Sequence, residues 1–211
     1  KYNFSSQNRA VTLKDYQSKI SLMPGEFGVP FRTGVFEQQN KINVYILGLD
    51  EDGKLDNTSN SAMRKNISEY LSDFRMINDF VEVSNGRVIN LKYEVDLFVE
   101  EDVPDSQVVS DAISTITDYN DIDNQQMGEN LYLGQLIEKL NNISGVLNVV
   151  EIRVFNPIGE GAYSLNEISQ PLIDDETRQI DLLGEATLFG EPISMFEVKH
   201  PSQDINVRVK K

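Results

Sequence analysis

The sequence predicts an α+β fold, in which two small layers of helix on antiparallel sheet follow one another and an irregular C-terminal extension comes last. Apolar residues recur at helical spacing in four segments and alternate at strand spacing between them. The 211 residues also exceed the usual size of one domain. After residue 157 glycines and prolines interrupt every period. We therefore expect a first domain over 1–86, a second over 87–157 and an extension over 158–211.

The first domain is expected to begin with a helix opened by Thr12 and Asp15, a weak relative of the capping box. Its apolar side carries Leu13, Tyr16 and Ile20, and Pro24-Gly25 ends it. An alternating strand over 27–35 then leads through a hairpin into the apolar run 42–49. Except at Asn43, the residues that would point to either face of this strand are apolar. This pattern predicts a central strand covered on both faces. A helix over 59–74 and a short strand over 80–83 complete the domain.

The second domain is expected to open with a hairpin at Asn85-Gly86, because both residues tolerate the positive φ of a tight turn. The strand that follows has one buried face, made of Ile89, Leu91, Tyr93, Val95, Leu97 and Val99. Its other face, which we expect to be wet, carries Asn90, Lys92, Glu94 and Asp96.

Two helices and a strand should complete this domain. The first helix is capped by Asp105 or Ser106 and has an apolar stripe made of Val109, Ala112, Ile113 and Ile116. Asn130 caps the second, whose apolar residues are Leu133, Leu136, Ile137 and Leu140. A strand over 146–155 follows Gly145, and Asn156-Pro157 ends it.

The extension holds one last predicted strand, marked by Ile205, Val207 and Val209. It also holds an apolar cluster made of Leu188, Phe189, Ile193, Met195, Phe196 and Val198. Apolar side chains outside a regular core either fold back on their own sheet or anchor a partner. Both interpretations are open, and we take the cluster as the candidate partner-binding site.

Composition limits the partners. A net charge of −15 repels a phosphate backbone and anionic lipid, so we expect neither nucleic acid nor membrane as a partner. Proteins, sugars and cations are left. No apolar run is long enough to span a bilayer. The chain opens with Lys1 and shows no signal-peptide core, so we expect a piece of a longer protein.

No set of residues with catalytic or ligand-binding spacing is found. The chain has no cysteine, and its one histidine, His200, excludes a two-histidine metal site. The acidic turns at Asp50 and Asp121 fail the calcium-loop register. Gly159-Glu160-Gly161 lacks the residues that cradle phosphate. We expect no catalytic, cofactor-binding or metal-binding residues, and no cofactor.

One family resemblance is visible. Arg9-Ala10-Val11-Thr12, followed by Asp15-Tyr16 and Pro24-Gly25, resembles the signature with which baseplate J-like proteins open this region. The order of later elements over residues 9 to 156 is similar to that family's layout. The acidic, Asn-rich character looks most like the C-terminal region of the large wedge proteins of T4-like phages.

The resemblance implies a non-enzymatic structural role in the baseplate of a virion tail assembled in the host cytoplasm. Wedge proteins of this family form an inner ring around the tail hub, so the implied partners are a second copy, in a homodimer within a six-fold ring, and other wedge proteins. Two alternatives are left open by the residues. One is an extracellular carbohydrate- or cation-binding module, compatible with the acidic charge and four glycosylation-acceptor matches. The other is a hydrolase that uses buried carboxylates.

Overall fold

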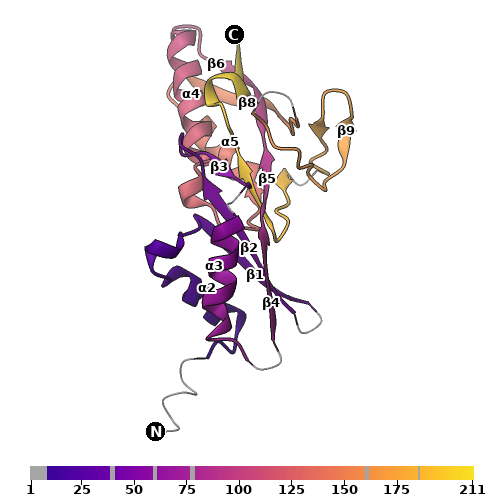
Figure 1. The fold of residues 1–211 in the computed structure, drawn as a ribbon. Coiled ribbons are helices and arrows are strands. Elements are labelled where there is room, and N and C mark those ends of the chain that lie inside the picture. The colour runs from indigo at the N-terminus through magenta and orange to yellow at the C-terminus, as the bar shows by residue number, and fades with distance from the viewer. Residues whose placement is uncertain (1–8, 39–40, 59–60, 77–78, 160–161, 185) are drawn as a thin grey trace. The chain divides into compact units, whose positions relative to one another are not determined.

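The structure is a computed structural model that describes residues 9–38, 41–58, 61–76, 79–159, 162–184 and 186–211 (Figure 1). It confirms the α+β class. The chain divides into two compact units, Lys1–Arg87 and Val88–Lys211. The expected boundary at 86/87 lies one residue from this division. Residues 158–211, expected as a separate extension, are part of the second unit.

The first unit is a sheet with two helices. Its elements are α2 (Leu13–Ser21), the short 3-10 helix η1 (Gly25–Phe27), β1 (Arg32–Gln38), β2 (Lys41–Leu49), β3 (Leu55–Asp56), α3 (Ser61–Ser72) and β4 (Phe80–Asn85). β2 pairs antiparallel with β1 and with β3, and parallel with β4. The core joins the buried sides of α2, β2 and α3.

The predicted helix start is confirmed in detail. The Thr12 hydroxyl accepts the Asp15 amide at 3.2 Å, and the Asp15 carboxylate accepts the Thr12 amide at 2.8 Å, which completes the capping box. These bonds satisfy two amide groups that the first helical turn leaves without partners.

Two predictions for this unit are corrected by the structure. The strand expected over 27–35 begins only at Arg32, because the chain turns through η1 and Gly28 has a φ of 85°. β2 is the central strand, as predicted, but its second face is covered only in part, since Leu47 is buried whereas Asn43 and Tyr45 are half-buried. The strand pairing is mainly antiparallel, as predicted, with one parallel pair between β2 and β4.

The hairpin expected at Asn85-Gly86 is not formed. Asn85 is the last residue of β4 and pairs with Ile46 of β2, and the Gly86 amide donates to the Ile46 carbonyl at 2.8 Å. The following strand, β5 (Arg87–Asn90), pairs instead with β12 (Ser194–Glu197). Asn-Gly here is the passage from one unit to the next.

The second unit is built on a five-stranded sheet in the order β13-β6-β8-β10-β9. These strands are β6 (Lys92–Val99), β8 (Val146–Phe155), β9 (Leu172–Asp174), β10 (Gln179–Ile180) and β13 (Ile205–Lys210). Its helices are α4 (Asp105–Tyr119), η2 (Ile122–Asn124), α5 (Leu133–Asn141) and α6 (Pro201–Asp204). β11 (Thr187–Leu188) pairs with β7 (Leu131–Tyr132).

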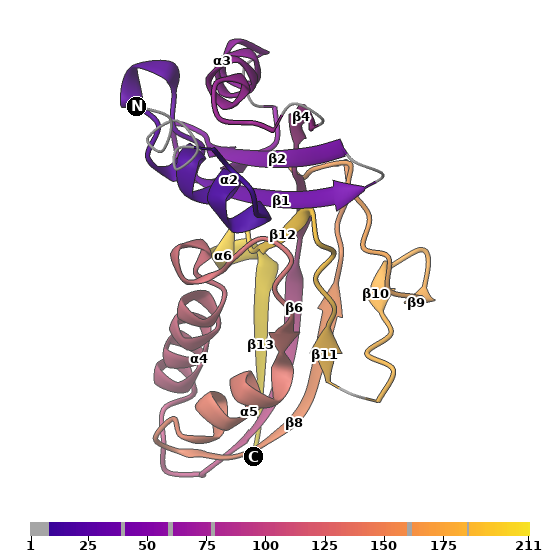
Figure 2. The same cartoon turned by 90° about the horizontal axis from the view of Figure 1, so that it is seen from below.

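The core of this unit lies between the sheet and its two long helices. All six apolar residues predicted for the strand 89–99 are buried, and they share one cluster with Val108, Ala112 and Ile116 of α4 and with Leu133, Leu136 and Leu140 of α5. Figure 2 shows α4 running beside β13 and α5 beside β8. The alternation in the sequence therefore predicted which face of the sheet is covered.

Local details of the second unit correct several predictions. The strand 89–99 is divided at Leu91 between β5 and β6. The α4 stripe contains Val108 in place of Val109, and Pro104 is its N-cap residue. Asn130 does not cap α5. Its side-chain oxygen accepts the Gly190 amide at 2.8 Å, 60 residues away, and therefore holds a distant loop.

The last strand, predicted at residues 205–209, is confirmed as β13. It pairs parallel with β6, whereas the other pairs of this sheet are antiparallel, so the sheet is mainly antiparallel as predicted. Because β9, β10 and β13 all come from residues after 158, the segment predicted as an irregular extension supplies both edge strands of the sheet.

Candidate functional site

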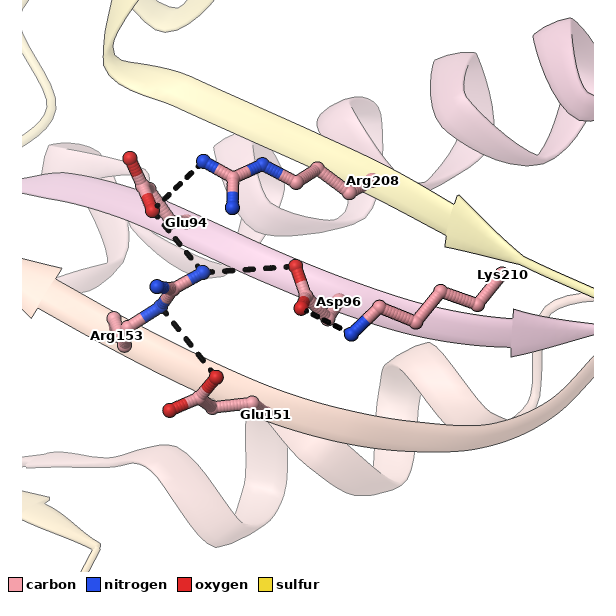
Figure 3. A network of polar contacts seen from close by, with 6 residues as sticks. All are labelled: Glu94, Asp96, Glu151, Arg153, Arg208 and Lys210. Atoms are coloured by element: carbon pink, nitrogen blue, oxygen red, sulfur yellow. Dashed lines mark hydrogen bonds and ion pairs between the residues drawn. The ribbon is translucent and has the colours of Figure 1, made fainter.

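The face of the five-stranded sheet that is turned away from α4 and α5 carries a row of charged residues. Side chains alternate between faces along a strand, so the residues between the core positions of β6, β8 and β13 gather on this outward face. Six of them form one connected network, which we call the charge ladder (Figure 3): Glu94, Asp96, Glu151, Arg153, Arg208 and Lys210.

Arg153 of β8 is the centre of the charge ladder. Its Nη2 atom lies 3.1 Å from Glu94 Oε2 and 3.6 Å from Asp96 Oδ1, and its Nε lies 3.6 Å from Glu151 Oε2. On the other side of β6, Arg208 Nη2 lies 3.2 Å from Glu94 Oε2. Three acidic and three basic side chains thus alternate across three strands, and the charge ladder is neutral.

Asp96 is the most enclosed member of the charge ladder, with 7% of its side chain exposed. Lys210 Nζ donates to its Oδ2 at 2.7 Å. This bond, together with the nearby Arg153 and Arg208, holds the pKa of Asp96 below its usual value although burial opposes the shift. The carboxylate therefore stays ionised and can fix the position of Lys210.

The charge ladder lies beside an irregularity of the sheet. Between β6 and β8 the register shifts after Asp96, whose partner is Glu151, whereas Leu97 pairs with Val149. Val150 is the extra residue, and half of its surface is exposed. A bulge weakens the backbone ladder locally. The ion pairs across Asp96 and Arg153 hold the strands together at that point.

A pocket of about 500 Å³ lies beside the charge ladder in the second unit. It is formed by residues of β6, β8 and β13, by Tyr163, and by the segments 157–158, 176–178 and 203–204. The lining residues important here are Lys92, Tyr163, Arg178, Gln203, Asp204 and Asn206. The wall of the pocket is partly apolar, because Phe155, Pro157 and Ile158 also line it.

Asp204 is the buried carboxylate of this pocket. Its Oδ1 accepts the Tyr163 hydroxyl at 2.5 Å, and its Oδ2 accepts the His200 backbone amide at 2.7 Å. Lys92 Nζ lies 3.9 Å from Oδ1 and 4.6 Å from the centroid of the Tyr163 ring. Burial, and then the bond to Asp204, raise the pKa of Tyr163. The tyrosine therefore remains a neutral donor, and the carboxylate serves as its acceptor.

The predicted partner-binding cluster is divided by the structure. Leu188, Met195, Phe196 and Val198 are buried in the second unit, and three of these four belong to its main core cluster. Phe189 is 41% exposed, and Ile193 is half-buried. The buried four fold back on their own unit. Of the six residues, Phe189 alone is exposed enough to contact a partner.

The acidic turn at Asp50 and the single histidine, His200, have local structural roles. The Asp50 carboxylate accepts the amides of Asp52 and Lys54, which makes it part of a turn. His200 is the N-cap residue of α6, and its ring meets the edge of Tyr163. Among the residues that the structure describes, no three His, Cys, Asp or Glu side chains are grouped to hold a metal ion. No helix in those ranges is long and apolar enough to cross a membrane.

The charge ladder was only half visible in the sequence. Glu94 and Asp96 were expected on a wet face, but the structure buries Asp96 and Asn90. In β13, Arg208 and Lys210 alternate with Val207 and Val209, so both cations lie on one face of the strand. This pattern could have indicated that the neighbouring strand carries acidic residues on the same face. That neighbour is more than 100 residues away in the chain.

No protein-family model matches the sequence, and no curated protein matches it. Among solved structures, a chain from the cryo-EM structure of the anti-feeding prophage (AFP) baseplate, 6-fold symmetrised, is similar in fold. The TM-score is 0.55 at 12% sequence identity, and the match covers 91% of this chain and 38% of that one. At this identity the likeness shows the fold alone. Both units of the chain thus share their fold with part of a protein found in the anti-feeding prophage baseplate.

Proposed function

We propose that this chain is a structural component of a contractile-tail baseplate, and that it acts through contact surfaces without catalysis. The single observation that carries the proposal is the match of 91% of the chain to part of a baseplate protein. A fold by itself hosts many functions. A match that spans two successive units is more informative, because it extends over both sheets and their helices.

The composition of the site supports a positional role. The acidic groups of the outward sheet face are engaged by cations in the charge ladder, and Asp204 accepts hydrogen bonds from Tyr163 and from a backbone amide. Such contacts fix strands and loops in place. A carboxylate that acts as a general base must lie within hydrogen-bond reach of a substrate proton, whereas these carboxylates bind groups of the chain itself.

The finer proposal is that the chain belongs to a wedge protein of the baseplate J-like type. It would then contribute to an inner ring around the hub in a virion tail baseplate assembled in the host cytoplasm. Its partners would be a second copy, in homodimers within a six-fold ring, and other wedge proteins. A net charge of −15 favours contact with complementary protein surfaces and keeps free copies apart.

The test is co-expression of the 211-residue chain with the other baseplate proteins encoded with it, followed by size-exclusion chromatography with light scattering. The proposal predicts a complex of fixed stoichiometry with at least one of them. Interfaces of this kind need at least about 1,000 Å² of buried surface. A chain that elutes as a monomer in every mixture would contradict the proposal.

One observation favours a second candidate, a carbohydrate-binding module. The pocket beside the charge ladder combines an aromatic ring, Tyr163, with the exposed amides of Gln203 and Asn206. Calorimetric titration with a glycan panel and with calcium separates the two candidates. The structural role predicts no saturable heat from any of these ligands, whereas saturable binding that is lost in Tyr163→Ala would establish the module.

A further inference from the structure

β13 is an edge strand with one side open to pairing. It is the first strand of the order β13-β6-β8-β10-β9, and its only strand partner among the described residues is β6. Across the described ranges no backbone hydrogen bond joins the other edge of Ile205–Lys210 to any residue. An edge of six residues with free backbone groups can accept another strand.

The side chains of β13 are sorted into two rows that suit different neighbours. Asn206, Arg208 and Lys210 point to the outward face, and the side chains of Arg208 and Lys210 are 50% and 53% exposed. Val207 and Val209 point to the core and are only partly buried. Both rows would gain contacts from a strand laid along the free edge.

The charges on the outward face determine which kind of strand could pair with the free edge of β13. The acidic row of β6 lies between cations on both sides, with Arg153 on β8 and Arg208 and Lys210 on β13. The two cations of β13 pair with Glu94 and Asp96 on the β6 side, and across the described ranges no ion pair joins them to a residue on the other side of the strand. Opposite charges on adjacent strands stabilise a sheet, and like charges destabilise it.

A second copy of the chain fits this edge poorly. Pairing two β13 strands about a two-fold axis would place the row of Arg208 and Lys210 against the same row of the other copy. Cationic side chains on an edge strand are a known device against such self-pairing. The charge pattern therefore excludes a symmetric β13 contact as the preferred arrangement and favours an acidic strand.

We propose that β13 accepts an extended acidic segment of a partner protein as a sixth strand of the sheet. Its acidic residues would face Arg208 and Lys210, and alternate β-branched residues would cover Val207 and Val209. This inference goes beyond the baseplate role and does not depend on it, since it concerns the chemistry of one edge.

The test uses an acetylated peptide of seven residues that alternates glutamate and valine, with a lysine-valine peptide of the same length as its counterpart. Binding to the 211-residue chain is followed by fluorescence anisotropy and by amide shifts and hydrogen exchange in NMR. The glutamate peptide is expected to protect amides of β13 and to bind about tenfold more tightly than the lysine peptide, as two to three cross-strand charge pairs would give.

Two controls separate strand addition from general attraction between charges. A fully N-methylated glutamate peptide keeps its charge but cannot donate backbone hydrogen bonds, so it is expected not to bind. The double variant Arg208→Glu, Lys210→Glu, whose fold is checked by circular dichroism, is expected to reverse the preference between the peptides. Lys65→Glu is the matched control, because Lys65 lies 75% exposed on α3 of the other unit, and the preference should not change.

Three outcomes would overturn the inference. Equal binding of the two peptides would remove the charge selection. Protection of amides outside β13, with none inside it, would place the peptide elsewhere. A dimer whose interface protects β13 in the absence of any peptide would show that a second copy is the occupant.

Discussion

At the scale of single residues, buried polar side chains hold the second unit together. Asn156 is fully buried: its side chain donates to the Asn90 carbonyl at 2.9 Å and accepts the Ile168 amide at 2.9 Å. Its backbone carbonyl accepts Arg178 Nε at 2.8 Å. One asparagine thus connects β5, the end of β8 and the long loop after it. The sequence marked it only as the end of a strand.

Removal of this side chain should destabilise the unit strongly. Asn156→Ala leaves the Asn90 carbonyl and the Ile168 amide buried without partners, and each such group costs about 1–3 kcal/mol. We expect the free energy of unfolding to fall by about 3 kcal/mol, measured by urea denaturation. Asn148→Ala, at an exposed position of the same strand, is the control and should change it by less than about 0.5 kcal/mol. Equal effects of the two variants would contradict this role.

Asp96 should make stability depend on pH in acid. Its pKa is lower in the folded chain than the ordinary value of 3.8, so its ion pairs stabilise the fold above that pH. This stabilisation is lost as the pH falls from about 3.8 through the lower folded pKa. At neutral pH, Asp96→Asn should reduce the free energy of unfolding by about 2 kcal/mol, because it leaves Lys210 and Arg153 without a buried partner.

The measurement is urea denaturation of both proteins between pH 7 and pH 2.5. The difference between wild type and Asp96→Asn should be constant down to about pH 4 and should shrink below it. Asp118→Asn, an exposed change of the same charge on α4, controls for net charge. A difference for Asp96→Asn that persists unchanged to the lowest pH would show that the carboxylate charge is not responsible.

At the scale of elements, close approach of backbones fixes the loop before β12. A Cβ atom at Gly190 would lie 2.3 Å from the carbonyl oxygen of Glu129, and the Gly190 amide is held by Asn130. This contact joins the loop before β7 to the one after β11. Only glycine allows it, because the obstacle is backbone and cannot rotate away.

Two glycine-to-alanine substitutions should therefore change the stability of the second unit in opposite directions. Gly190→Ala forces the two loops apart and should destabilise the second unit by at least about 2 kcal/mol. Gly134→Ala lies in α5 with free space around the added methyl, and alanine is the better helix former by about 1 kcal/mol, so this variant should be more stable. Thermal unfolding of both variants measures the effect, and destabilisation by both would refute the packing argument.

Elements whose signals are local could be predicted from the sequence, and their pairing could not. The capping box of α2, the alternation of β6 and the valines of β13 each predicted an element that the structure confirms. The parallel partners of β2 and β13 and the passage at Asn85-Gly86 were missed, because they depend on residues far apart in the chain. The charge ladder was missed for the same reason, since its members come from three distant strands.

At the scale of the whole molecule, the chain consists of two compact units, and the second carries the charge ladder on the outward face of its sheet. The net charge of −15 lies outside the neutral charge ladder. Long-range repulsion therefore opposes contact between free copies, and any stable contact needs locally complementary surfaces. The fold of the two units is shared with part of a chain from the anti-feeding prophage (AFP) baseplate, and the match covers 38% of that chain.

The most direct test of the baseplate role is a cryo-EM reconstruction of the particle whose genome encodes this chain. The account predicts density for both units in the baseplate, in six-fold related copies around the hub, with side chains that fit the charge ladder. Density for this chain in a fibre, in the tube or in no part of the particle would contradict it.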